Sequence, residues 1–322
     1  MPNCYEHLSL ETPTFTALLP TTMTVSTKYE HDAEAADVVL FTADSIGGTT
    51  EFHVHKSILA AASPFFEDMF SLPQDLHMSP GPTTTLKQLP TPLPVIPLPE
   101  PADVLDTILQ FIYPGPVPHV ASFDELTVLL GVAIKYDIVT LVDALRALLV
   151  SPRFVTTDPI RAYAIACRFD LDEEARIASG WTLSVDILGD EDDSYAENVT
   201  SMLPHPSLKY ISAYDYRRLL TLHRRRAKAA CKLLQISDDV KCMHCNGSAF
   251  TMHAPPKWWW EWTASVKKEM MKRPTTDKIF QVDWVFDSAK KAGCHGCVES
   301  VVHSWKWLLG LKESIDALPV TI

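Results

Sequence analysis

Hydrophobic and polar positions are patterned most clearly between residues 37 and 72. The apolar run 38–41, with Gly47–Gly48 after it, is typical of a buried strand that enters a tight turn. Apolar residues and histidines alternate over 52–55, so we expect a second strand whose two faces differ. Apolar residues at helical spacing follow, and Pro64 marks the start of a second helix. The segment predicts two strands that lead into a pair of helices.

A proline-rich stretch interrupts this pattern. Nine prolines fall within the 29 residues 73–101, which is too many for a helix or a central strand. We predict an extended loop inserted over 73–94, and a polyproline ligand for a partner's aromatic groove remains an alternative. The apolar residues 95–98 then predict a third strand. Because Pro97 lacks a backbone N–H, we expect this strand at a sheet edge.

Helical periodicity dominates the rest of the chain. Ser122 and Glu125 have the spacing of a capping box. The acidic segment Gly189–Asp193 is a candidate domain boundary. We expect a solvated loop there and not a calcium site, because the spaced ligands of a calcium-binding loop are missing. Residues 1–30 show no sustained periodicity, so we expect a disordered or loosely attached arm without a helix or strand. Helices are predicted over 103–113, after Ser122, and over 139–150, 159–169, 172–187 and 216–234.

The ordered motifs of the first half resemble a BTB/POZ domain. The resemblance is carried by Asp37 to Leu40, Phe52 to Leu59, Ser63 to Phe70, Val95 to Leu98, Val104 to Gly115 and Leu129 to Asp137. It implies an α+β domain over residues 31–150, in which helices flank a small sheet, and a helical extension over 151–188. It also implies a protein-interaction module with no catalysis of its own. We expect a mainly α-helical C-terminal region over 207–322.

The resemblance also implies partner-binding positions. Asp37 and Lys56 match the acidic and basic residues of a charged pocket in relatives that recruit corepressors, with a structural ion pair as the alternative. Phe66, Met69 and Phe70 are candidates for an apolar contact with a partner such as a cullin.

Two departures from the family bear on partners. Relatives that serve as ubiquitin-ligase adaptors carry a Glu in the loop before the third strand, but no Glu occurs between Glu67 and Glu100, so we predict weak or no cullin binding by that route. Relatives often dimerise through an N-terminal helix and strand, which the arm 1–30 lacks in recognisable form, so a homodimer stays open. His55 is expected to be a hydrogen-bonded core histidine.

Two Cys-x-x-Cys pairs lie near the end of the chain. Cys242 and Cys245 are separated by 48 residues from Cys294 and Cys297, and two such pairs complete the Cys₄ set that structural zinc prefers. Buried reduced thiols without metal are an equally weighted alternative, and a redox role is less favoured because no thioredoxin-like pattern surrounds the pairs. Three histidines are spare ligands: His244, His253 and His295.

A tryptophan-rich helix is expected between the pairs. It follows Pro255–Pro256 and carries Trp258, Trp259, Trp260 and Trp262. Adjacent side chains point in different directions on a helix, so we expect most of these rings in the core and not on a binding platform. The order Cys-x-x-Cys, Pro-Pro-x-Trp-Trp, Cys-x-x-Cys is similar to the C-terminal region attached to BTB domains in many fungal proteins, and that resemblance implies no activity.

Charge is unevenly distributed within the net −12 of the chain. Residues 1–206 carry 9 Lys and Arg against 29 Asp and Glu, whereas residues 207–322 carry 19 against 11. The two parts are expected to meet different partners or to attract each other, with ordinary solvated surfaces as the alternative. Arg224–Arg226 lies in the predicted helix 216–234, whose polar face is basic, so zinc-dependent nucleic-acid or chromatin binding is the competing function. It is less favoured, because the chain is acidic overall and no nucleic-acid-binding signature occurs.

Missing motifs bound the remaining classes. No apolar run reaches the roughly 18 residues of a membrane span, and the first residues lack the features of a signal peptide, so we expect an intracellular protein in the cytoplasm or nucleus. No phosphate-binding glycine loop, Gly-x-Ser-x-Gly elbow or His-Glu-x-x-His motif occurs, so an enzyme is not expected. The sequence predicts a protein-interaction scaffold that acts in transcriptional regulation or in ubiquitin-ligase substrate recruitment.

Overall fold

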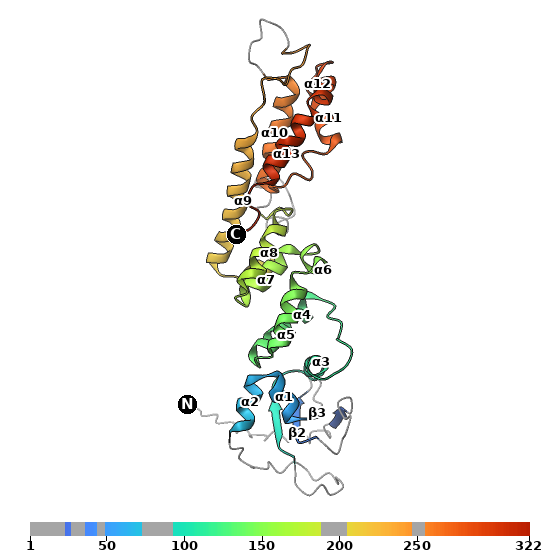
Figure 1. Ribbon diagram of the computed structural model, residues 1–322, viewed down its shortest axis with the longest axis vertical. Coiled ribbons are helices and arrows are strands. Elements are labelled where there is room, and N and C mark those ends of the chain that lie inside the picture. The colour runs from blue at the N-terminus through green and yellow to red at the C-terminus, as the bar shows by residue number, and fades with distance from the viewer. Residues whose placement is uncertain (1–22, 27–35, 44–48, 73–92, 188–204, 247–254) are drawn as a thin grey trace, which may run out of the picture. The chain divides into compact units, whose positions relative to one another are not determined.

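The computed structural model describes residues 23–26, 36–43, 49–72, 93–187, 205–246 and 255–322 (Figure 1). The chain divides into two compact units. The N-terminal unit comprises the chain up to Val120 together with Val128–Val142, and the C-terminal unit comprises Ala121–Thr127 together with Asp143–Ile322. Several predicted features lie outside the described residues: most of the arm 1–30, the Gly47–Gly48 turn, nearly all of the insertion 73–94 and the acidic segment 189–193.

A mixed four-stranded sheet forms the base of the N-terminal unit. Its strand order is β1-β3-β2-β4. The central strands β2 and β3 are antiparallel, with Leu40 opposite Phe52, as the sequence predicts. β4 pairs in parallel with β2 at the edge, where Pro97 lies opposite Phe41, so the edge position predicted from Pro97 is confirmed. The strands are β1 (Met23–Ser26), β2 (Val38–Ala43), β3 (Thr49–Val54) and β4 (Val95–Leu98).

The strand β1 corrects the expectation for the arm. Its four residues, Met-Thr-Val-Ser, run parallel to β3, with Val25 opposite Glu51. A segment this short cannot display a period in its own sequence, and its conformation is defined by the backbone ladder to β3, which lies more than twenty residues further along the chain.

The hydrophobic core of the N-terminal unit lies against the sheet. Val38, Val39 and Leu40 are all buried, which confirms that β2 is covered on both faces. Along β3, burial alternates and includes Phe52 and Val54. Three helices complete this part of the unit: α1 (Lys56–Ala62), α2 (Pro64–Ser71) and α3 (Ala102–Ile112).

Two polar groups fix elements that are distant in the sequence. The Ser63 hydroxyl accepts a hydrogen bond from the Phe66 N–H at 3.1 Å, which caps α2, and donates one to the Tyr136 carbonyl at 2.5 Å. The buried Glu100 carboxylate is bound by Lys135 Nζ and by the Tyr136 hydroxyl, each at 2.5 Å. A buried carboxylate needs such partners, so Glu100 holds the chain that leaves β4 against the segment around Tyr136.

The C-terminal unit begins with short helices. Ser122 is the N-cap that the sequence predicts, since the Glu125 N–H donates to Ser122 Oγ at 3.2 Å. The Glu125 carboxylate accepts from the Ala121 N–H at 2.7 Å, one residue before the N–H that a capping box uses. The helix predicted over 172–187 ends earlier, at Thr182. The elements are α4 (Phe123–Lys135), which the two units share, α5 (Val139–Leu149), α6 (Pro152–Val155), α7 (Pro159–Arg168), α8 (Asp172–Thr182) and the 3₁₀ helix η2 (Pro206–Tyr210).

Five further helices complete the described part of the C-terminal unit. They are α9 (Ala213–Leu233), α10 (Lys257–Lys272), α11 (Val282–Lys291), α12 (Cys297–His303) and α13 (Trp305–Asp316). Their shared core contains Trp258, Trp262 and Val266 together with buried residues from the other helices. In the described part of the chain, no helix has both the length and the apolar character needed to cross a membrane.

Candidate metal centre

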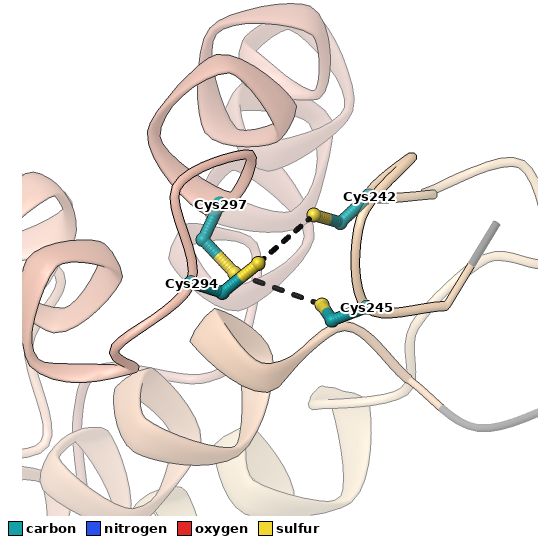
Figure 2. Close-up of side chains that lie close together, drawn as sticks. All are labelled: Cys242, Cys245, Cys294 and Cys297. Atoms are coloured by element: carbon teal, nitrogen blue, oxygen red, sulfur yellow. Dashed lines mark hydrogen bonds between the residues drawn. The ribbon is translucent and has the colours of Figure 1, made fainter.

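Four cysteine sulfurs meet in the C-terminal unit. Figure 2 shows Cys242 and Cys245 on one loop facing Cys294 and Cys297. The Sγ atoms of Cys242 and Cys294 are 3.7 Å apart, those of Cys245 and Cys297 are 3.8 Å apart, and all four lie within 4.8 Å of one another. A tetrahedral ion with bonds of about 2.3 Å to sulfur places its ligands about 3.8 Å apart. The four thiols lie close enough together to hold one metal ion.

The first pair sits on a loop closed by its own hydrogen bonds. The Cys242 N–H donates to the Asn246 side-chain oxygen at 2.5 Å, and the Asn246 N–H donates back to the Cys242 carbonyl at 3.1 Å. The second pair is built at the start of α12, where the Cys297 N–H donates to the Cys294 carbonyl at 3.1 Å. Each Cys-x-x-Cys segment therefore curls around its two sulfurs.

Gly296 allows the two loops to approach each other. A Cβ atom at this position would lie 2.2 Å from Cδ2 of His244 and 3.1 Å from Sγ of Cys242. The first distance is shorter than a non-bonded contact allows and the second is tighter than most, so a side chain here would require the exposed His244 ring to turn aside or one Cys-x-x-Cys loop to shift. Close packing favours glycine at this position, whereas its backbone φ of −83° is open to any residue.

The N-terminus of α10 points its free amides at the sulfurs. Pro256, its N-cap, provides no side-chain acceptor. The Lys257 N–H donates instead to Cys245 Sγ at 3.4 Å, and the Trp258 N–H hydrogen-bonds Cys297 Sγ. The first amides of a helix have no partner within it and carry partial positive charge, so they stabilise thiolates. This arrangement suits sulfurs that bear negative charge.

Burial opposes that charge in the protein without a cation. Burial raises the pKa of the Cys297 thiol and, to a smaller extent, that of Cys245. At Cys294 burial also acts to raise the pKa, but hydrogen bonds from the Gly296 amide and the neighbouring thiols outweigh it, and the pKa lies below its ordinary value. Four adjacent thiolates would repel one another, and a divalent cation is the group that would compensate them.

A second layer of hydrogen bonds supports the cluster. The Trp258 indole N–H donates to Ser300 Oγ at 3.0 Å, and that hydroxyl donates to the Lys241 carbonyl at 2.8 Å. Ser300, which is buried, therefore joins α10 and α12 to the residue before Cys242. The sequence pattern does not identify Ser300, Asn246 or Gly296, because none of them is itself a metal ligand.

The tryptophan-rich helix forms the core behind the metal centre. Trp258, Trp259 and Trp262 are buried, as expected for most of these rings, whereas Trp260 is 61% exposed. The four thiols form the cluster without the spare histidines: His244 and His295 are exposed, and His253 lies outside the described residues.

In the N-terminal unit, Asp37 and Lys56 lie together, but through the backbone of Lys56. The Asp37 carboxylate accepts a hydrogen bond from the Lys56 N–H at 2.7 Å, at the start of α1. The Lys56 ammonium lies over the Phe70 ring, 5.8 Å from its centroid. His55, expected as a hydrogen-bonded core histidine, is half-buried, and its Nδ1 lies 3.1 Å from the Tyr113 hydroxyl.

The predicted apolar contacts on α2 divide between the surface and the core. Met69 and Phe70 are half-buried. Phe66 is only 2% exposed and stacks on Tyr136 with ring centroids 5.4 Å apart, so it belongs to the core and we withdraw it as a surface contact. Its neighbour Phe65 is the exposed ring on this helix.

The run Arg224–Arg226 is also divided. Arg224 and Arg225 are exposed, but Arg226 is buried. Its guanidinium donates to the carbonyls of Pro274 at 2.8 Å, Leu318 at 2.5 Å, Pro319 at 3.1 Å and Ile315 at 3.2 Å. The run therefore offers two, not three, side chains to an outside ligand.

Comparison with known protein families identifies the N-terminal unit. A small mixed sheet flanked by helices places it among α+β domains. Residues 27–152 match the family model of the BTB/POZ domain. The chain therefore contains a BTB/POZ domain, which indicates a protein-interaction module, and a mostly helical region carrying the Cys₄ cluster follows it. A search of curated proteins found no match.

Proposed function

We propose that this protein is a non-enzymatic scaffold, which binds protein partners through its BTB/POZ domain and keeps its helical C-terminal unit folded around a structural zinc ion. The match of residues 27–152 to the BTB/POZ family carries the first half of the proposal. The convergence of four sulfurs from two distant loops supports the second.

The proposed partner surface lies on α1 and α2 of the BTB/POZ domain. We define the α2 patch as Lys56, Phe65, Met69 and Phe70. Phe65 is 42% exposed, Met69 and Phe70 are half-buried, and the ammonium of Lys56 lies over the Phe70 ring. An aromatic and aliphatic surface next to a cation is the composition that supplies most of the energy in protein interfaces.

Two narrower roles fit this surface to different degrees. A corepressor pocket would use Asp37 and Lys56 as a charge pair, but the carboxylate of Asp37 already accepts the Lys56 amide. A cullin adaptor would use the apolar part of the α2 patch, although no Glu occurs between Glu67 and Glu100 to complete the adaptor signature. We place transcriptional regulation ahead of ubiquitin-ligase recruitment, because both charged residues of the corepressor pocket are present, whereas the Glu of the adaptor signature is missing.

A homodimer is included in the proposal. The strand β1 supplies one of the N-terminal elements through which relatives dimerise, and it already pairs with β3. Light scattering tests this directly, since a dimer has twice the 36.0 kDa mass of the chain.

Zinc fits the four thiols better than a harder cation. Soft thiolates prefer zinc over magnesium or calcium, and four of them leave no open position for a substrate or water. Cys242, Cys245, Cys294 and Cys297 would hold the ion, which would join the two loops and so support the core of α10–α13. The competing proposal, nucleic-acid binding by the basic region, is weakened because Arg226 faces inwards.

Quantitative partner capture tests the interaction role. The tagged full-length chain is compared with Lys56→Glu/Phe65→Ser in the α2 patch and with Asp103→Ser, an exposed position on α3. We expect a set of proteins bound by the wild type and by the control but lost from the patch variant, with all three chains melting at similar temperatures. A capture profile that is identical for the three chains would contradict the assignment of the α2 patch.

A further inference from the structure

A groove runs along α9 on a part of the C-terminal unit that the metal centre does not use. We define the α9 groove by the residues that carry the following argument: Arg217, Arg218, Leu222, Arg225, Leu318 and Pro319. Its volume is about 430 Å³. The lining on α9 extends from Tyr214 to Ala229, fifteen positions or about 22 Å along a helix.

The far wall of the α9 groove is held in place by Arg226. Its buried guanidinium binds the carbonyls of Ile315, Leu318 and Pro319. This fixes the segment after α13 beside α9. The Ile322 N–H adds a hydrogen bond to Ser179 Oγ at 3.2 Å. The groove is therefore a built feature of the fold with two anchored walls.

The chemistry of the α9 groove is both apolar and basic. Leu222, Leu318 and Pro319 provide apolar lining. Arg218 is shared between Asp172 and Asp215, at 3.7 and 3.6 Å. Arg217 and Arg225 are exposed and make no ion pair with any described residue. Two guanidinium groups thus remain for ligands, about two helical turns apart on α9 and with Leu222 between them in the chain.

We propose that the α9 groove binds an acidic peptide segment of a partner protein, whose apolar side chains lie on Leu222 and Leu318 and whose carboxylates pair with Arg217 and Arg225. A nucleic acid would satisfy the guanidinium groups but would leave the apolar lining without a counterpart. The groove length accommodates about six or seven residues of extended chain at about 3.3 Å each. This site is separate from the BTB/POZ domain, so its test does not depend on partner binding by the α2 patch.

The test uses defined peptides and the full-length protein. An array of 12-residue peptides, each with three Glu and two Leu at varied spacings, is screened, and the strongest binder is labelled with fluorescein for anisotropy titration. The test variant is Arg217→Glu/Arg225→Glu. The control is Arg224→Glu/Lys228→Glu, which makes the same charge change at exposed positions on the same helix outside the groove.

We expect saturable binding by the wild type, at least a tenfold weaker affinity in the groove variant and less than a threefold change in the control. Replacing both Leu residues of the peptide by Ser should weaken binding by a similar factor. The proposal fails if no peptide in the array binds. It also fails if both variants lose affinity equally, or if a DNA duplex binds more tightly than the best peptide, because a general basic surface would then be acting. Matching melting temperatures of the two variants confirm that both are folded.

Discussion

The carboxylate of Asp37 lies 2.7 Å from the backbone nitrogen of Lys56, and its partner is this N–H and not the ammonium group. Asp37 precedes β2, while Lys56 is the first residue of α1. His55, the N-cap of α1, provides no side-chain hydrogen bond. Asp37 therefore caps α1 from a distant position in the chain, with its negative charge at the positive end of the helix.

Because Asp37 binds the backbone of Lys56, the side chains of the two residues should contribute differently to the free energy of unfolding. We expect Asp37→Ala to lower the free energy of unfolding by about 1 kcal/mol through the lost cap, and Lys56→Ala to change it by less than about 0.5 kcal/mol. Urea denaturation followed by circular dichroism measures the free energy of unfolding of both variants. Tryptophan fluorescence would not report on this unit, because the N-terminal unit contains no tryptophan. Similar losses for the two variants, with a strong coupling in the double variant, would instead indicate an ion pair.

Zinc content tests the metal centre. The purified chain should hold about one zinc per molecule, and Cys294→Ser should lose it, because three thiolates and a hydroxyl bind the ion far less well. Cys231→Ser is the matched control, since Cys231 is a half-buried thiol outside the cluster. The melting temperature should fall with Cys294→Ser and with chelation of the wild type. Unchanged zinc content in Cys294→Ser would show that the ion lies elsewhere.

Gly296→Ala should weaken metal binding without removing a ligand. The added methyl would lie 2.2 Å from the His244 ring and 3.1 Å from Cys242 Sγ, so the ring must turn aside and the loop that carries Cys242 must shift. We expect zinc affinity to fall by about 10- to 100-fold, measured by competition with a chromophoric chelator. Gly310→Ala is the control, because nothing lies within 4 Å of a Cβ atom there. Adding His244→Ala should recover part of the loss; no recovery would place the strain at Cys242 alone.

His223 makes the C-terminal unit sensitive to acid. The Thr182 hydroxyl donates to the Ser179 carbonyl, so its oxygen accepts from Nε2 of His223, at 3.0 Å. Nδ1 is buried without a partner among the described residues. Burial lowers the pKa of His223 to about 4, because protonation would place an unpaired N–H in the core.

The sign of the effect follows from linkage. His223 takes up a proton near pH 6.5 in the unfolded chain and near pH 4 in the folded chain. The free energy of unfolding that depends on neutral His223 is therefore complete above pH 6.5 and is lost as the pH falls towards 4. Between pH 8 and pH 5 the loss is about 2 kcal/mol. Tryptophan fluorescence in urea measures it selectively, since all eight tryptophans lie in the C-terminal unit. His223→Gln should flatten the difference between the two pH values; the same slope in both chains would exclude His223.

Arg226 should be essential to the stability of the C-terminal unit, and Arg225 should not. Arg226→Lys removes most of the four carbonyl contacts, because one ammonium cannot reach all of them, and we expect a loss of about 3 kcal/mol. Arg225→Ala should stay within about 0.5 kcal/mol of the wild type. Equal effects at the two positions, measured by tryptophan fluorescence, would contradict the structural role of Arg226.

Features that depend on neighbours in the sequence could be predicted. Three of them rest on single residues or on residues a few positions apart: the N-cap at Ser122, the edge position of Pro97 and the two Cys-x-x-Cys pairs. The BTB/POZ domain was identified for the same reason, since its motifs are short and occur in a fixed order.

Features that depend on partners far away in the chain could not be predicted from the sequence. Arg226 lies seven positions after Leu219 and four before Ala230, so helical spacing puts it beside the apolar stripe, but spacing cannot show that carbonyls near the end of α13 bind its guanidinium there. The strand β1 needs β3 as its partner, and Phe66 is buried because Tyr136, seventy positions later, covers it. Gly296 and Ser300 act on the metal centre only through the packing of its two loops.

The distance between the two cysteine pairs also matters during synthesis. Cys242 and its partner Cys294 are 52 positions apart, so a ribosome that adds about 5–20 residues per second completes the second pair about 3–10 s after the first. During that interval the nascent chain carries one Cys-x-x-Cys loop that has no second loop to share an ion with. The α10 helix, which follows this loop, is translated before its sulfur partners are complete. The metal centre can therefore close only after Cys297 has left the ribosome.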